Sequence, residues 1–168
     1  MTEDTWKLVL LDVAKDSARV LDCAERARDY ILFEAGREPD ADWVIGFFND
    51  VPPGRTKDDV LMFGVEQPDG TLDGLLGVSP GYETQTEWYI GLLLLVQERR
   101  SKGIGTTVLR DLIALAKSAG AETLKLAVFV ENPDALRFWQ RHGFVHFRDA
   151  SDDGQGDGHD RVVLHRQI

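Results

Sequence analysis

The sequence lacks several features that would place it in a specialised class of protein. It has a single cysteine, Cys23, so no internal disulfide can form, and we expect a buried structural thiol there. The longest unbroken apolar run, Trp88 to Val96, has nine residues, whereas a membrane-spanning helix needs about 20. Basic residues are also few: 19 Lys and Arg face 29 Asp and Glu, and the net charge of −10 argues against nucleic acid as a partner.

What is present fits one ordinary globular domain over residues 1–168. Apolar side chains make up 43% and charged ones 29%, and a chain of this length buries a sizeable core without a metal or a disulfide. The first residues, MTEDTWKLVLLDVAKD, are acidic and contain no small-residue cleavage site. We therefore expect a cytoplasmic protein that binds neither a membrane nor a metal ion.

Apolar periodicity and turn residues predict a mixed α/β fold with about seven strands and about four helices. The expected strands are Trp6–Val13, Val60–Glu66, Leu72–Val78, Trp88–Val96, Leu124–Val130, Phe144–Phe147 and Arg161–Leu164. The expected helices are one capped by Asp16 or Ser17 that runs through Ile31, one over Asp40–Asn49, one from Ile104 to Ala119 and one over Pro133–His142. The nearly continuous apolar run Trp88–Val96 is typical of a central strand covered on both faces.

The turn after this central strand reads RSKGIG and opens the strongest helix of the chain. A helix N-terminus has unpaired N–H groups and partial positive charge, so it binds anions. Gly103 and Gly105 remove side chains that would keep a diphosphate from these amides. Arg100 and Lys102 add positive charge, and the hydroxyl of Thr106 is within reach. The turn therefore predicts a pyrophosphate site, although the glycines alone also fit a tight strand-to-helix turn.

Two familiar phosphate motifs are absent from this turn. The dinucleotide-binding fingerprint needs a third glycine where Val108 stands, and the P-loop needs Gly-Lys followed by Ser or Thr. A nucleoside triphosphate or NAD is therefore a poor fit to the sequence.

The pattern Arg-x-x-Gly-x-Gly after an apolar strand resembles the signature of the GNAT superfamily of N-acetyltransferases. A second block, from Asn132 to Phe144, is similar to the later pattern of that family, with Ala135, two aromatic residues and Gly-Phe. The resemblance implies a mixed, mostly antiparallel sheet whose central strand and next strand splay apart. It also implies that the pantetheine arm of acetyl-CoA lies in the gap between them.

The same resemblance implies which residues bind the co-substrate acetyl-CoA. They come from the end of the central strand, the glycine turn and the second block. They are Leu94, Leu95, Val96, Arg100, Ser101, Lys102, Gly103, Ile104, Gly105, Thr106, Asn132 and Trp139. Asn132 is also a preferred helix N-cap, so it can serve either role or both.

Trp139 departs from the family pattern, because many members carry a tyrosine there that protonates the departing thiolate. An indole N–H cannot supply a proton near neutral pH, and we expect Trp139 to pack beside the thioester or in the core. The attacking amine must also lose a proton. Strand alternation places Glu87, Tyr89, Gly91, Leu93 and Leu95 on one face, and Glu87 and Tyr89 are the candidate bases.

The resemblance implies transfer of an acetyl group to a primary amine by direct attack in a ternary complex. The acceptor, a small molecule or a peptide, is expected to contact Trp43, Phe47 and Tyr82. A non-catalytic acyl-CoA-binding or regulatory module is the alternative function. The sequence does not decide between a monomer and a homodimer.

An acidic segment near the end of the chain partly matches the residue pattern of an EF-hand calcium loop. Asp149, Asp153 and Asp160 occupy three of its ligand positions, but the last position lacks the bidentate glutamate and the flanks are expected to be strands. We expect a solvated loop without a metal ion.

Overall fold

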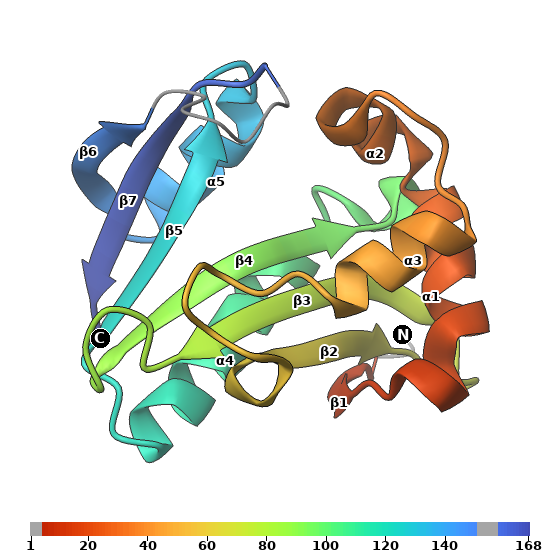
Figure 1. Cartoon of the computed structure of the whole chain (residues 1–168), viewed down its shortest axis with the longest axis horizontal. Helices are drawn as coiled ribbons and strands as arrows, with labels where there is room; N and C mark the ends of the chain where they lie inside the picture. Colours follow the sequence, from red (N-terminus) through yellow and green to blue (C-terminus); the bar gives the residue numbers. More distant parts are fainter. Residues whose placement is uncertain (1–4, 151–157) are drawn as a thin grey trace.

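The computed structural model describes residues 5–150 and 158–168, which form one seven-stranded sheet flanked by helices (Figure 1). The strands are β1 (Lys7–Leu10), β2 (Leu61–Glu66), β3 (Leu72–Pro80), β4 (Glu87–Leu95), β5 (Thr123–Phe129), β6 (Val145–Ala150) and β7 (Arg161–Gln167). Their order is β1-β2-β3-β4-β5-β7-β6, and only β4 and β5 are parallel neighbours. The predicted fold class, a mixed and mostly antiparallel α/β sheet, is confirmed.

Helices cover both faces of the sheet (Figure 1). They are α1 (Val13–Arg26), α2 (Arg28–Ala35), α3 (Ala41–Phe48), α4 (Ile104–Ser118) and α5 (Pro133–Arg141), with short 3₁₀ turns η1 (Lys57–Asp59) and η2 (Gln97–Arg99). The helices α1, α2 and α3 contribute to one apolar cluster, and α4 and α5 contribute to the other. In the part of the chain that the structure describes, no helix combines the length and apolar character needed to cross a bilayer.

The N-terminal helix differs from the prediction at both ends. It begins at Val13, because Asp12 is the N-cap and its Oδ1 accepts from the amides of Ala14 and Lys15, so Asp16 and Ser17 lie inside the helix. The single helix expected through Ile31 is two helices, since the backbone leaves the helical region at Ala27 (φ −110°, ψ 24°). This break raises the α-helix count of the described residues to five instead of about four.

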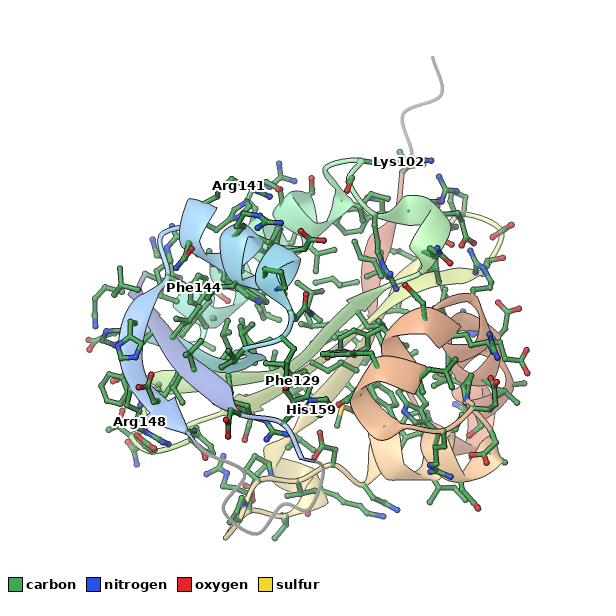
Figure 2. All side chains as sticks on the ribbon, turned by 90° about the horizontal axis from the view of Figure 1, so that it is seen from above. Lys102, Phe129, Arg141, Phe144, Arg148 and His159 are labelled. Carbon is green, nitrogen blue, oxygen red and sulfur yellow. The ribbon has the colours of Figure 1, made fainter. Side chains whose placement is uncertain are left out.

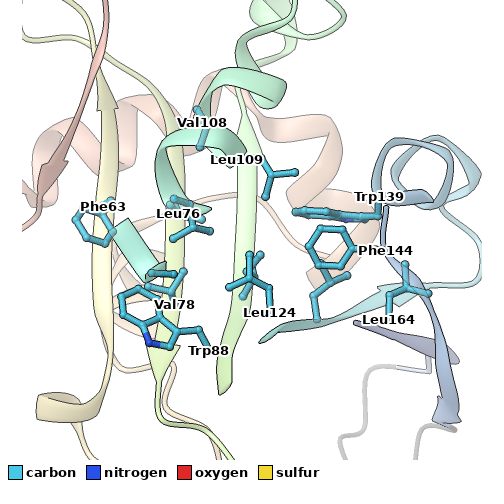
Figure 3. Close-up of a cluster of buried hydrophobic side chains, with 14 of the residues drawn as sticks. Phe63, Leu76, Val78, Trp88, Val108, Leu109, Leu124, Trp139, Phe144 and Leu164 are labelled. Atoms are coloured by element: carbon cyan, nitrogen blue, oxygen red, sulfur yellow. The ribbon is translucent and has the colours of Figure 1, made fainter. Parts of the chain in front are cut away.

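Two buried apolar clusters hold the layers together. The larger one joins the sheet to α4 and α5, and Figure 3 shows Trp139, Phe144, Leu124 and Leu164 packed within it. The other lies under α1, α2 and α3 and includes Cys23, which is fully buried as predicted. Burial raises the pKa of this thiol to about 12, so it stays protonated and unreactive at neutral pH.

A β-bulge at Gly91 corrects the predicted faces of β4. Val78 of β3 pairs with Ile90 while Gly77 pairs with Leu92, so Gly91 is an extra residue on β4. Ile90 and Leu93 consequently pack on the same face, towards α4, although simple alternation would put them on opposite faces. The prediction that Tyr89 and Leu93 share a face is therefore wrong.

The strands β4 and β5 splay apart as the family resemblance implied. They pair over four residue pairs, from Glu87↔Thr123 to Ile90↔Leu126, and then diverge (Figure 1). Beyond this point β4 pairs only with β3, and β5 pairs only with β7. One edge of each strand is left without a strand partner, and the gap between them is where the candidate site lies.

The acidic segment predicted to be a solvated loop falls mainly in residues 151–157, which lie outside the described residues.

Candidate active site

A pocket of ≈ 1450 Å³ occupies the gap between β4 and β5. Its walls include Gly91 to Leu95 from β4 and Ala127 to Phe129 from β5. From this gap it continues in two directions, to the start of α4 at Gly103 and to the aromatic residues Tyr82 and Tyr89. One pocket therefore connects the predicted diphosphate site with the predicted acceptor site.

The open edge of β4 directs backbone groups into this pocket. The amide of Val96 donates to the carbonyl of Asp73 on the β3 side, at 3.0 Å. Because a trans peptide points its C=O opposite to its N–H, the carbonyl of Leu95 faces the β5 side. In an extended residue the N–H and C=O point the same way, so the N–H of Leu95 also faces the gap, as does that of Leu93 by alternation. Val96 itself, predicted to contact the co-substrate, is buried and has its N–H engaged.

The start of α4 presents backbone groups of the kind that bind an anion. Gly103 is its N-cap with φ of 83°, a conformation that glycine adopts at little cost, and no side chain caps the helix. Ser101 also has a positive φ, 58°. The N–H groups of the first helical turn have no partner within the helix and point towards its N-terminus, where the pocket lies.

Packing, as well as the predicted binding of a diphosphate, favours glycine at position 105. A Cβ atom there would lie 3.2 Å from the ring of Phe138, so glycine allows α4 to approach α5 closely. The neighbouring Thr106 pairs its hydroxyl with Nε2 of His142 at 3.0 Å, while Nδ1 of His142 lies 2.7 Å from the Phe138 carbonyl. Since a carbonyl only accepts, Nδ1 is the donor, and in the neutral ring Nε2 accepts from Thr106.

The two predicted cations of the turn are placed differently. The guanidinium of Arg100 lines the pocket, but it makes two bonds to Asp29 at 2.5 and 3.0 Å and one to the Leu95 carbonyl at 3.0 Å. The bonds from Arg100 are the main cause that lowers the pKa of Asp29. Lys102 does not line the pocket and lies at the outer edge of the molecule (Figure 2).

Three further residues of the predicted cradle have structural roles. Ile104 is buried in the α4 cluster and does not line the pocket. Asn132 lines the pocket and caps α5, because its Oδ1 accepts from the Ala135 amide at 3.2 Å. Trp139 touches the pocket but is only 7% exposed, with its ring edge-on to Phe138 and Phe144 (Figure 3).

Glu87, the first candidate base, is held away from the pocket. Its Oε2 lies 3.0 Å from Nζ of Lys125, a buried amine that also bonds Glu83 at 2.8 Å. The other oxygen, Oε1, is buried with no hydrogen-bond partner among the described residues. Lys125 stands 38 residues later in the sequence, so this pairing could not be seen from the start of β4 alone.

Tyr89, the second candidate, lines the pocket with its ring stacked on Tyr82 at 4.7 Å. Burial raises the pKa of Tyr89 to about 12, so at neutral pH it is a phenol that donates a hydrogen bond and does not act as a base. Of the other predicted acceptor contacts, Phe47 lines the pocket, whereas Trp43 stacks behind it at 5.9 Å and does not.

Sequence reasoning missed Asp50, which follows α3 and lines the pocket near Tyr89. The residue keeps solvent exposure, yet the atoms around the carboxyl desolvate it and raise its pKa above the ordinary 3.8. The residues next to it in the sequence, Val51, Pro52 and Pro53, form no local pattern that marks a site residue.

Helix α2 closes the open end of the gap, which the sequence also did not reveal. Phe33 of α2 meets the rings of Phe129 and His159, with centroids 5.7 and 5.0 Å away, and Figure 2 shows Phe129 and His159 side by side. Nε2 of His159 lies 3.1 Å from the Phe33 carbonyl, and Nδ1 lies 3.1 Å from Glu131. Both partners only accept, so the two bonds form together when the ring is an imidazolium.

The split sheet with a glycine-rich helix start at its open end is the architecture of an acyltransferase. The acetyltransferase (GNAT) family matches residues 14–144 of the chain. The chain belongs to this family, as the sequence motifs had indicated.

Individual proteins are similar to the chain in part of its sequence or in its fold. A stretch of 65 residues is 32% identical to N-alpha-acetyltransferase 30 of Schizosaccharomyces pombe, and it covers 39% of this chain and 43% of that protein, less than half of its length. An acetyltransferase from Thermus thermophilus shares the fold with a TM-score of 0.74 and 21% identity, over 98% of this chain and 97% of that one. Spermidine N-acetyltransferase from Vibrio cholerae, solved with CoA and spermine, gives a TM-score of 0.73 at 18% identity, over 98% and 96%.

Proposed function

We propose that this protein is an N-acetyltransferase that transfers an acetyl group from acetyl-CoA to a primary amine by direct attack in a ternary complex. The observation that carries the proposal is the open edge of β4, from Gly91 to Leu95, which ends one short turn before the uncapped N-terminus of α4. An unpaired strand edge suits the amide groups of a pantetheine arm, and a helix N-terminus suits a diphosphate.

The residues present fit coenzyme A. Gly103 leaves space, since an added Cβ would meet nothing within 4 Å, and the Leu93 and Leu95 amides face the gap. Acetyl-CoA, when bound, supplies an activated acetyl thioester. A backbone N–H of β4 near Leu95 can polarise its carbonyl, which is a role of the oxyanion-hole type.

The acceptor amine has to be neutral when it attacks, and Asp50 is the group best placed to take its proton. It lines the pocket near Tyr89, and its raised pKa makes the carboxylate more basic than a fully solvated aspartate. Glu87 is ion-paired with Lys125 away from the pocket wall, and Tyr89 is a neutral phenol. The thiolate leaves without a dedicated acid, because its reference pKa of about 8.5 makes it a tolerable leaving group.

The test combines binding with turnover. Calorimetry with CoA should show binding, with ADP as the competitor for a nucleotide site, and acetyl-CoA should release thiol with at least one member of a panel of amino acids, peptides, polyamines and aminoglycosides. CoA binding without thiol release across the panel would refute the transferase.

That outcome would favour the second candidate, a non-catalytic acyl-CoA-binding module. The observation in its favour is Trp139, which stands where many GNAT enzymes carry a tyrosine and packs mainly into the core. Turnover with any amine would exclude it.

A further inference from the structure

The acceptor end of the pocket has walls from two connections that lie apart in the sequence. The first wall is Val51, Pro52 and Pro53, from the connection between α3 and η1. The second wall is Tyr82, from the connection between β3 and β4, and its ring stacks on that of Tyr89 at 4.7 Å. Neither connection is part of a helix or a strand, so other contacts have to hold the two walls in place.

A tight turn shapes the first wall. The amide of Arg55 donates to the carbonyl of Pro52 at 3.1 Å, which closes a β-turn over residues 52–55. A type II turn prefers proline at its second position and a residue with positive φ at its third, and Pro53 and Gly54, with φ of 77°, stand there. The turn therefore brings Arg55 directly beside the wall residues.

The side chain of Arg55 joins this turn to the second wall. Its Nη1 donates to the carbonyl of Gly81 at 2.9 Å, and its Nη2 donates to the carbonyl of Pro80. Gly81 directly precedes Tyr82, so the guanidinium is bonded to the backbone next to the aromatic wall. In the part of the chain that the structure describes, no other hydrogen bond joins residues 49–56 to residues 80–86.

The second wall is also attached to the sheet, independently of Arg55. The amide of Tyr82 donates to the carbonyl of Glu87 at 2.9 Å, and Glu83 is ion-paired with Lys125 of β5 at 2.8 Å. These contacts hold the connection after β3 against β4 and β5. Loss of the Arg55 side chain should therefore release the first wall from the second and leave the sheet as it is.

We propose that Arg55 is a positioning residue for the acceptor amine, because it holds the first wall at a fixed place relative to Tyr82. The proposal rests on the proposed function and adds to it a residue that does not itself line the pocket. A guanidinium suits this role, since its planar fork of N–H donors bonds two neighbouring carbonyls at once. Lysine keeps the charge and a donor but lacks the fork.

The experiment compares Arg55→Gln and Arg55→Lys with the wild type, using CoA and the panel amine that the wild type acetylates with the highest kcat/KM. We expect Arg55→Gln to raise KM for this amine by at least about tenfold, with kcat changed by less than about threefold and CoA affinity in calorimetry unchanged. Arg55→Lys should recover part of the loss. Arg110→Gln, which alters an exposed arginine of α4 outside the pocket, is the matched control and should match the wild type.

Hydrogen exchange tests the link between the walls without an amine. The amides of Arg55 and Thr56 donate to the Pro52 carbonyl and to Oδ2 of Asp59, so both report on the order of the first connection. Exchange over residues 49–56, corrected for intrinsic rates, should be faster in Arg55→Gln than in the wild type. Equal exchange would overturn the proposal.

The kinetic outcomes separate this proposal from the function on which it rests. Equal KM for the amine in Arg55→Gln and the wild type overturns the positioning role and leaves the transferase intact. A loss of CoA affinity as large as the loss for the amine also overturns it, because Arg55 would then act on the whole fold. Absence of thiol release with every amine refutes the proposed function and the positioning role with it.

Discussion

Gly103 is the single residue on which the proposed diphosphate site depends most. It adopts φ of 83° at the N-cap of α4, where an L side chain is strained. We expect Gly103→Ala to lower the free energy of unfolding by about 1 to 2 kcal/mol and to weaken CoA binding by about tenfold, because relief of the strain turns the first amides of α4 away from the pocket. Urea unfolding and calorimetry measure the two effects.

The matched control is Gly120, which has φ of 88° just after α4 and, like Gly103, no atom within 4 Å of an added Cβ. Gly120→Ala should cost similar stability and leave CoA affinity unchanged. Equal CoA affinity in the two variants would contradict the role given to Gly103.

The raised pKa of Asp50 leads to a prediction about the pH dependence of kcat/KM. Its pKa is raised, so the carboxylate needed to accept a proton exists above that pKa and is lost as the pH falls through it. We expect kcat/KM to fall on the acid side of the profile, and Asp50→Asn to lower kcat/KM by about 100-fold and to remove this limb. Asp58→Asn changes an exposed carboxylate of η1 outside the pocket and should leave the profile unchanged. A full acid limb in Asp50→Asn would assign the base to another group.

At the scale of elements, α2 is joined to the β5 side of the pocket through His159. Its ring nitrogens lie 3.1 Å from the Phe33 carbonyl and 3.1 Å from Glu131, and the ring packs against the Phe33 ring. We expect His159→Gln to loosen α2, so hydrogen exchange of the α2 amides should be faster in this variant than in the wild type.

His146→Gln alters an exposed histidine of β6 and is the control, so it should leave exchange in α2 unchanged. Equal exchange in His159→Gln and in the wild type would show that His159 does not hold the helix.

The sequence predicts elements well where local signals decide them. The helix start after Gly103, the Asn132 cap and the central strand all follow from glycine, capping and apolar patterns within a few residues. The bulge at Gly91 depends on the pairing of β4 with β3, and the partner of Glu87 comes from β5. Asp50 lines the pocket only because the connection after α3 folds over the sheet, so no local pattern marks it.

For the whole molecule, acid should unfold the protein and neutral pH should not. Ion pairs lower the pKa values of Asp29 and Glu66, and the pKa of Asp16 is lowered as well. A carboxyl whose folded pKa is below its unfolded value stabilises the fold above the unfolded value, and this stabilisation disappears as pH falls through the folded value. The free energy of unfolding should therefore be nearly constant from pH 6 to 8 and decline below about pH 4. A steady decline from pH 8 to 6 would contradict this balance.

At alkaline pH the groups that matter are buried acids whose pKa values are raised in the folded protein. Burial raises the pKa values of Cys23 and Tyr89 to about 12, so their contribution is complete below the unfolded values and is lost as pH rises from there towards 12. Stability should decline again above about pH 9, and Cys23→Ala should reduce that decline.

The bulge decides which residues of β4 face α4. Trp88 and Ile90 before Gly91, and Leu93 and Leu95 after it, all pack towards α4 because one extra residue separates the two pairs. Deleting Gly91 would bring Ile90 and Leu93 to the spacing of simple alternation, so every apolar side chain would keep its layer and only the bulge would be lost. Regular pairing of the full-length strand would instead turn one half over and exchange the layers of its side chains, so the strand carries a phase as well as a sequence.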